Sequence, residues 1–182
     1  MNIVFRNFDI NMENISFLET KKNIIMDGNF TKIIYSDIFV TMNGLFINIP
    51  LINHIETINN STRFFINKDS IERDPVLYNT NDINAFYFNY NCNNLNIINS
   101  LSDIENKLLD YYKHFYNVNK TCTYSIYNQL LSGKIKIYRE NRHRDHTEKI
   151  YKSKIILKIS GIWETMNDIG ITYKFLEMYE LL

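Results

Sequence analysis

The chain has 182 residues, and its 20 lysines and arginines balance 20 aspartates and glutamates, so the net charge at pH 7 is zero. Hydrophobic residues make up 45% and aromatic residues 14% of the chain, which excludes intrinsic disorder. The length suits one compact domain over residues 1–182. No apolar run approaches the roughly 18–20 residues that cross a bilayer, and the first residues lack the order of a signal peptide. We therefore expect a soluble, intracellular protein without a membrane partner.

Residues 1–100 are expected to be rich in β-structure, because Ile, Val, Tyr, Phe and Thr recur there in short runs separated by Asn, Asp and Gly. The dipeptide Asn43-Gly44 lies between two such runs and predicts a hairpin, since both residues tolerate positive φ. The segment around Asp74-Pro75 reads as a loop. The pattern predicts strands near 31–41, 45–52, 62–67 and 85–90.

Residues 101–132 break this pattern and predict a helical insertion. Ser102 and Glu105 have the spacing of a capping box and precede apolar residues at helical spacing, so a helix is expected over 103–117. Its Tyr-rich face is expected to pack on the sheet, with partner binding as the alternative. A second helix or helical turn is expected over 122–131, ended by a glycine cap at Gly133.

Residues 133–182 are expected to form a basic strand, a loop and a C-terminal hairpin. In the first strand, 134–139, Lys134, Lys136 and Tyr138 alternate with Ile135, Ile137 and Arg139, so the two sets occupy opposite faces. A charge-dense loop is expected over 140–150. In the next strand, 151–163, the pattern places Ile155, Leu157 and Ile159 on one face and Lys154, Ile156, Lys158, Ser160 and Ile162 on the other. A turn over 167–170 then leads to a last strand, 171–179, with Ile171, Tyr173 and Phe175 on one face.

Positive charge is concentrated in one segment, because nine of the 20 lysines and arginines fall between Lys134 and Lys158, against only three carboxylates. Cations that follow phosphates, interleaved with aromatic rings that stack on bases, are typical of single-stranded nucleic-acid binding. The plainer alternative is a solvated, charged hairpin whose aromatic residues lie in the core. The candidate nucleic-acid-binding residues are Lys134, Lys136, Tyr138, Arg139, Arg142, Arg144, Tyr151, Lys152, Lys154, Lys158, Trp163 and Tyr173.

Other site chemistries find little support in the sequence. His143, Asp145 and His146 suggest a metal site, but the neighbouring Arg142 and Arg144 would repel a cation, so no metal site is expected. The sequence contains no phosphate-cradling glycine loop, no nucleophile elbow and no zinc-protease motif. We therefore expect a protein that is not an enzyme and has no cofactor.

Three segments together carry a resemblance to a known family: YSDIFVTMNGLFINIPL (35–51), LLDYYKHFYNVNKTCTYSIYNQLLSGKIKIY (108–138) and ILKISGIWETMNDIGITYKFLEMYEL (156–181). They resemble single-stranded DNA-binding proteins of large double-stranded DNA viruses, similar to the short-tailed-phage type. The resemblance implies an OB-like Greek-key barrel whose concave face binds single strands. The phage-type proteins carry an acidic C-terminal tail that recruits partners, whereas the last residues here, FLEMYELL, include only Glu177 and Glu180.

The sequence-based expectation is thus a mainly β protein with one or two helices (α+β), built as an OB-like Greek-key barrel with a mid-chain helix. Its expected function is binding of single-stranded DNA without sequence specificity, in viral replication or recombination in an infected host cell. The alternatives are a viral structural or protein-interaction protein, and an RNA-binding protein. A homo-oligomer and contacts with replication proteins stay open.

Overall fold

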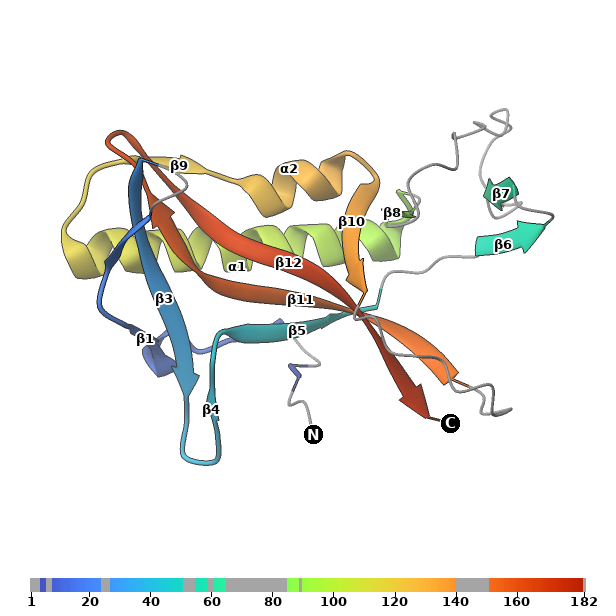
Figure 1. Cartoon of the computed structure of the whole chain (residues 1–182), viewed down its shortest axis with the longest axis horizontal. Helices are drawn as coiled ribbons and strands as arrows, with labels where there is room; N and C mark the ends of the chain where they lie inside the picture. Colours follow the sequence, from blue (N-terminus) through green and yellow to red (C-terminus); the bar gives the residue numbers. More distant parts are fainter. Residues whose placement is uncertain are drawn as a thin grey trace.

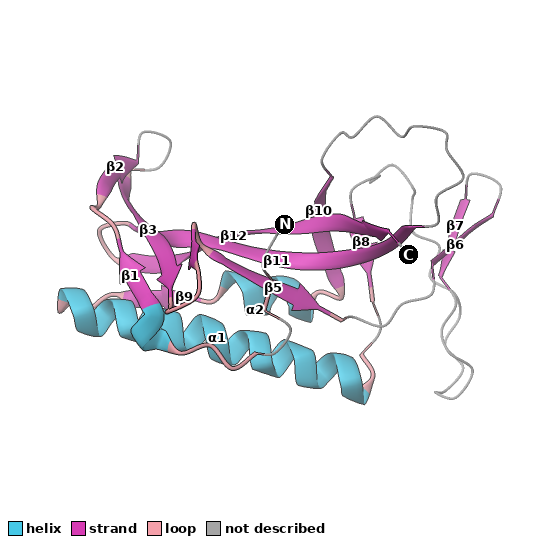
Figure 2. Cartoon of the chain, turned by 90° about the horizontal axis from the view of Figure 1, so that it is seen from below, coloured by secondary structure: helices cyan, strands magenta, loops and turns pink. Residues whose placement is uncertain are grey.

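A ten-stranded sheet covered on one face by two helices forms the body of the molecule (Figures 1 and 2). The computed structural model describes residues 4–5, 8–23, 27–50, 55–58, 61–64, 85–88, 90–139 and 151–181. The helices are α1 (Cys92–Tyr116) and α2 (Ser125–Leu131), and a 3₁₀ turn, η1, spans Met12–Asn14. The expectation of a mainly β protein with two helices is confirmed.

Most strands belong to one sheet. They are β1 (Ile15–Phe17), β2 (Lys21–Asn23), β3 (Gly28–Ser36), β4 (Thr41–Met42), β5 (Leu45–Ile49), β8 (Ala85–Tyr87), β9 (Thr121–Thr123), β10 (Lys134–Arg139), β11 (Tyr151–Glu164) and β12 (Asp168–Leu181). A separate two-stranded sheet consists of β6 (Ile55–Ile58) and β7 (Ser61–Phe64). Strand β8 falls within the run predicted over 85–90, and β7 overlaps the run predicted over 62–67, whereas the predicted loop at Asp74-Pro75 lies outside the described residues.

The long antiparallel hairpin of β11 and β12 forms the centre of the large sheet. On the far side of β11, β3 and β5 pair antiparallel with successive parts of that strand. On the far side of β12, β9 and β10 pair parallel to it, so the sheet is mixed. The expected OB-like Greek-key barrel is not confirmed, because the described strands form an open sheet rather than a closed one.

The prediction of a hairpin at Asn43-Gly44 is wrong, because the strands on either side of this dipeptide do not pair with each other. Strand β3 turns back earlier, through residues 37–40, and pairs with the short β4. Gly44 does adopt positive φ, 98°, but it redirects the chain from β4 into β5, and β5 pairs with β11. Asn-Gly therefore marks a change of direction, as its tolerance of positive φ allows, while a different turn joins the paired strands.

Helix α1 begins eleven residues before its predicted start. Its N-cap is Asn91, whose side chain accepts a hydrogen bond of 2.7 Å from the backbone N–H of Asn94. The predicted capping box at Ser102 and Glu105 lies inside the helix instead, so that prediction is wrong. Local capping residues recur in this Asn- and Ser-rich segment, and burial of Ile97, Ile98 and Leu101 extends the helix past them.

Glu105 is fully buried and caps the other helix. Its Oε1 accepts from the backbone N–H of Ile126 at 3.0 Å and its Oε2 from that of Tyr127 at 2.9 Å, at the start of α2. Burial raises the pKa of Glu105, although these N–H groups partly oppose the rise. Helix α2 has no side-chain cap of its own, so a carboxylate from α1 satisfies its first N–H groups.

The second predicted helix, 122–131, is confirmed in its C-terminal part. Residues 121–123 form β9 instead, and α2 begins at Ser125. Gly133 follows the helix with φ of 67°, as a glycine after a helix C-terminus is expected to do. Strand β10 then starts at Lys134, as predicted.

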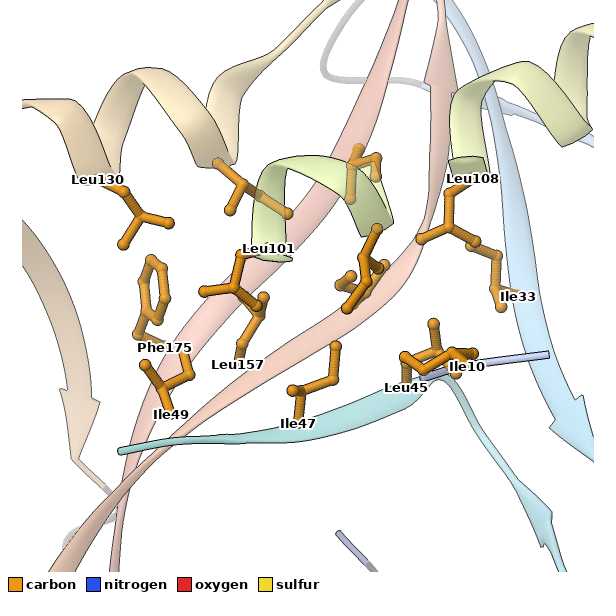
Figure 3. Close-up of a cluster of buried hydrophobic side chains, with 14 of the residues drawn as sticks. Ile10, Ile33, Leu45, Ile47, Ile49, Leu101, Leu108, Leu130, Leu157 and Phe175 are labelled. Carbon is orange, nitrogen blue, oxygen red and sulfur yellow. The ribbon is translucent and has the colours of Figure 1, made fainter. Parts of the chain in front are cut away.

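The hydrophobic core fills the space between the helices and one face of the sheet (Figure 3). Helix α1 contributes Leu101 and Leu108, and α2 contributes Leu130, all without exposed surface. Each strand of the sheet contributes alternate residues to this core. The inward faces predicted for β10 and β12 are therefore confirmed. These buried strand residues include Ile33, Leu45, Ile47, Ile49, Ile135, Ile137, Ile155, Leu157, Ile159, Ile171 and Phe175.

A β-bulge at Ser160 interrupts the alternation of β11. Ile159 pairs with Tyr173 and Gly161 with Thr172, so Ser160 is the extra residue. Beyond it the faces exchange: Ile162 is fully buried in the core cluster instead of sharing the face of Lys154 and Lys158. The predicted placement of Ile162 is therefore wrong, because sequence alternation alone does not reveal the extra residue.

The same bulge turns Glu164 toward α1, where a short polar chain joins sheet and helix. Tyr112 donates its hydroxyl to Glu164 Oε2 at 2.7 Å, and Lys120 Nζ donates to Glu164 Oε1 at 2.5 Å and to the carbonyl of Thr165 at 2.6 Å. Burial alone would raise the pKa of Glu164, but the hydrogen bonds from Lys120 and Tyr112 hold it below its ordinary value. Burial raises the pKa of Tyr112 to about 12. Both carboxylate oxygens of Glu164 thus accept hydrogen bonds from within the protein.

Candidate nucleic-acid interface

Strand β10 presents its predicted outward residues as the sequence indicated. Ile135 and Ile137 are buried, while Lys136 and Tyr138 are exposed on the opposite side. The Lys136 ammonium lies 5.5 Å from the centre of the Tyr138 ring, within the range of a cation–π contact. Lys134 is half-buried and already has an interaction partner. This strand thus offers one cation and one aromatic ring to an outside partner.

Five predicted binding residues have no described side chain. Arg142 and Arg144 lie outside the described residues. For Arg139, Tyr151 and Lys152 only the backbone is described: Arg139 pairs with Glu177, Tyr151 with Leu181 and Lys152 with Glu180. Their roles stay predictions from the sequence.

The structure identifies a more compact candidate on the central strands. We call the side of the sheet opposite α1 and α2 the open face. The register of β3, β5, β11 and β12 places the same set of alternate residues there. Its members near the middle are Phe30, Lys32, Phe46, Asn48, Lys154, Ile156, Lys158, Trp163, Thr172 and Lys174, of which Ile156 is buried.

Three lysines, Lys32, Lys158 and Lys174, gather on the open face, and we call them the lysine cluster. Lys158 on β11 is in direct register with Lys174 on β12, and Lys32 on β3 is in register with Gly161. No ion pair between two described residues involves any of the three lysines. Burial, and then the nearby charges of Lys174 and Lys32, lower the pKa of Lys158. This lysine cluster is a preformed site of positive potential.

Like charges directly opposite one another destabilise an antiparallel pair. The Lys158–Lys174 pair therefore costs stability in the free protein, and an anion that binds between the two ammonium groups would remove that repulsion. Lys158 also lies 5.0 Å from the centre of the Phe46 ring, its neighbour in register on β5. The cluster thus combines cations with an aromatic side chain at one point.

Two further aromatic rings rest on glycines beside the cluster. A methyl group placed at Gly170 would collide with the ring of Trp163, its partner in register. A methyl group at Gly161 would lie 2.7 Å from atoms of the Phe30 ring. Aromatic rings often fill the space over cross-strand glycines. Both rings are half-buried and lie next to lysines of the cluster, an arrangement that suits stacking on an unpaired base.

Tyr173, predicted to stack on bases, occupies the other face. Its hydroxyl donates to the carbonyl of Ser125 at 3.0 Å and to Gln129 Oε1 at 2.6 Å, both in α2. Burial raises the pKa of Tyr173 to about 12. Because its ring packs against Phe175 in the covered layer, we leave Tyr173 out of the candidate interface.

Sequence reasoning missed Phe30, Lys32, Phe46 and Lys174, because none of them lies in the basic segment 134–158. Strand alternation gave the available signal: Lys32 alternates with buried Thr31 and Ile33, and Phe46 with buried Leu45 and Ile47. What the pattern could not show is which strands are neighbours, and hence that these residues meet Lys158.

Among the described residues, no group of three or more His, Cys, Asp and Glu side chains could hold a metal ion. His143, Asp145 and His146, at which the sequence predicts no metal site, lie outside the described residues. No helix in the described part of the chain is both long enough and apolar enough to cross a bilayer.

Comparison with known proteins adds no family assignment: the sequence matches no protein-family model, and neither a curated protein nor a solved structure matches the chain.

Proposed function

We propose that this protein binds single-stranded DNA on the open face of its sheet. The observation that carries the proposal is the cluster of Lys32, Lys158 and Lys174, which forms no ion pair with a described carboxylate and lies beside the rings of Phe30 and Trp163. Ammonium groups neutralise phosphates, and aromatic rings stack on bases whatever the sequence. Binding is therefore expected to show little sequence preference. A role in replication or recombination is a prediction from the family resemblance alone.

The interface proposed here differs from the basic segment expected from the sequence. Of the residues predicted there, Lys158 and Trp163 lie at its centre, and Lys136 and Tyr138 lie on the neighbouring strand β10. Tyr138 is in register with Leu176, which shares the outward side of β12 with Lys174, so the face continues from β12 onto β10. A strand of DNA crossing from β3 toward β10 would pass over cations and rings in turn.

The test is a fluorescence-anisotropy titration with a labelled oligo-dT over a series of salt concentrations. If the three lysines each neutralise one phosphate, log K should fall with log salt at a slope of about −2. The variant Lys32→Gln/Lys174→Gln should weaken binding and flatten this slope by more than half. The matched control, Lys107→Gln/Lys113→Gln, removes the same charge from α1 on the other side of the molecule and should leave the slope unchanged.

Trp163 supplies a second readout, because it is the only tryptophan in the chain. Its fluorescence should be quenched when oligo-dT binds, and Trp163→Leu should weaken binding about tenfold or more. Equal loss of binding in the α1 control, or binding without any change in Trp163 fluorescence, would place the DNA elsewhere. Competition with a matched RNA oligonucleotide would show whether RNA is the preferred ligand instead, since contacts to the 2′-hydroxyl distinguish the two.

A further inference from the structure

The two rings of the candidate interface are neighbours across two strands, and polar side chains lie behind them. Phe30 on β3 is in register with Trp163 on β11, and we call these two side chains the ring pair. The next residue along each strand, Thr31 on β3 and Glu164 on β11, projects to the opposite side of the sheet and bonds to α1. Figure 2 shows α1 along that side of the sheet.

The hydroxyl of Tyr112 in α1 joins these two polar side chains. It donates to Glu164 Oε2 at 2.7 Å. Because a tyrosine hydroxyl has only one proton to donate, the Thr31 hydroxyl, 3.2 Å away, donates to Tyr112 and in turn accepts from the Thr20 hydroxyl at 2.7 Å. Both Tyr112 and Thr31 are buried. One side chain of α1 therefore bridges β3 and β11 at the level of the ring pair.

The second carboxylate oxygen of Glu164 holds the end of β11 in place. Lys120, in the connection after α1, donates to Glu164 Oε1 at 2.5 Å and to the carbonyl of Thr165 at 2.6 Å. Both acceptors directly follow Trp163 in the chain, and the ring of Trp163 lies over Gly170 on the other side of the β11–β12 turn. These bonds therefore restrain the backbone that carries the tryptophan ring.

The relative position of β3 and β11 sets the relative position of the two rings, because each strand carries one of them. A single strand that stacks on both rings gains most when they are already fixed, since a preformed site loses little conformational entropy on binding. Tyr112 bonds to the residue that follows each ring in the chain. Its hydroxyl is therefore placed to fix the ring pair from behind.

We propose that Tyr112 is a positioning residue that holds the ring pair for stacking on unpaired bases. Through Thr31 and Glu164 its hydroxyl keeps β3 and β11 at a fixed offset, so that the two rings form one stacking surface. This role rests on the proposed binding of single-stranded DNA to the open face. It assigns part of the binding energy to a buried side chain that does not touch the DNA, and it leaves the phosphate contacts of the lysine cluster unaffected.

Tyr112→Phe tests this role, because it removes the hydroxyl and keeps the ring, whose centre lies 5.3 Å from that of Phe17. In the free protein, acrylamide should quench Trp163 fluorescence more strongly than in wild type. Affinity for oligo-dT should fall about fivefold, a part of the contribution of a stacked base, while the salt slope stays unchanged. Tyr173→Phe is the matched control: it removes a hydroxyl that also joins sheet to helix, and it should change none of these quantities.

A double-mutant cycle separates positioning from a general loss of stability. In a Phe30→Leu/Trp163→Leu background, Tyr112→Phe should cause no further loss of oligo-dT affinity, because the rings through which the hydroxyl acts are absent. Thr31→Val breaks the same link at its other end and should behave like Tyr112→Phe. An equal loss in both backgrounds, or wild-type affinity and quenching in both link variants, would overturn the role of Tyr112 alone. Failure of the wild-type protein to bind oligo-dT would overturn the proposed function with it.

Discussion

Charged side chains on the two sides of the sheet differ in whether they have partners within the described part of the protein. In the layer between the sheet and the helices, Glu105 of α1 and Glu164 of β11 each accept hydrogen bonds from donors elsewhere in the chain, and Lys120 is paired with Glu164. On the open face, Lys158 and Lys174 oppose each other in register with no described carboxylate paired to either. Charge in the covered layer is satisfied within the protein, whereas the opposed lysines of the open face form no ion pair with a described carboxylate.

This difference predicts different consequences of substitution on the two sides. A buried carboxylate is tolerated only with donors, and removing the group leaves those donors unsatisfied. A set of opposed surface lysines brings no stability and, without an anion, costs some. We therefore expect substitutions on the covered face to reduce stability, and substitutions in the lysine cluster to reduce binding without reducing stability.

The largest effect is expected from Glu105→Ala. This change leaves the backbone N–H groups of Ile126 and Tyr127 without acceptors at the start of α2, which should cost about 3 kcal/mol in free energy of unfolding. Urea denaturation measures it. Asp103→Ala, an exposed change in the same helix, should stay within about 0.5 kcal/mol of wild type. A loss below about 1 kcal/mol for Glu105→Ala would mean that α2 does not depend on this cap.

Lys120→Met should have an intermediate effect that depends on pH. At neutral pH the lost ion pair with Glu164 should cost about 1–2 kcal/mol. Because the pKa of Glu164 is lowered in the folded protein, the pair stabilises above the ordinary value of 4.5 and loses this contribution as pH falls through the lowered pKa.

The difference in unfolding free energy between wild type and Lys120→Met should therefore shrink from neutral pH to about pH 3. Denaturation at both pH values checks this. Lys107→Met, an exposed lysine of α1, serves as the control and should show no such change. A difference that persists unchanged in acid would show that packing of the lysine stem, rather than its charge, stabilises this region.

The smallest effect, and the one of opposite sign, is expected from Lys174→Gln. Removing one of two opposed charges should raise the free energy of unfolding by about 0.2–0.5 kcal/mol, while it weakens oligo-dT binding. Denaturation of the free protein and anisotropy titration of the same preparation measure the two quantities. If Lys174→Gln lowered stability, the Lys158–Lys174 pair would not be destabilising, and the expected difference between the two sides of the sheet would be wrong.

Much of the local structure could be predicted from the sequence. Alternation located the buried faces of β10 and of the last strand, and Gly133 marked the end of α2. Two local signals misled: Asn43-Gly44 does not join paired strands, and Ser102 does not start a helix. Each of these short motifs is compatible with more than one backbone structure. Which structure forms depends on burial against residues that are distant in the sequence.

The sequence by itself determined that the chain is mainly β with a mid-chain helix, and that Lys158 and Trp163 were candidates for binding. Only the tertiary structure decided that they share a face, since strict alternation from Ile159 would have sent Trp163 into the core. The bulge at Ser160 exchanges the two sides of β11, and strand pairing then brings Lys32, Phe46 and Lys174 beside Lys158. Side-chain alternation is a local property, whereas register and strand order follow from burial of the whole sheet against α1 and α2.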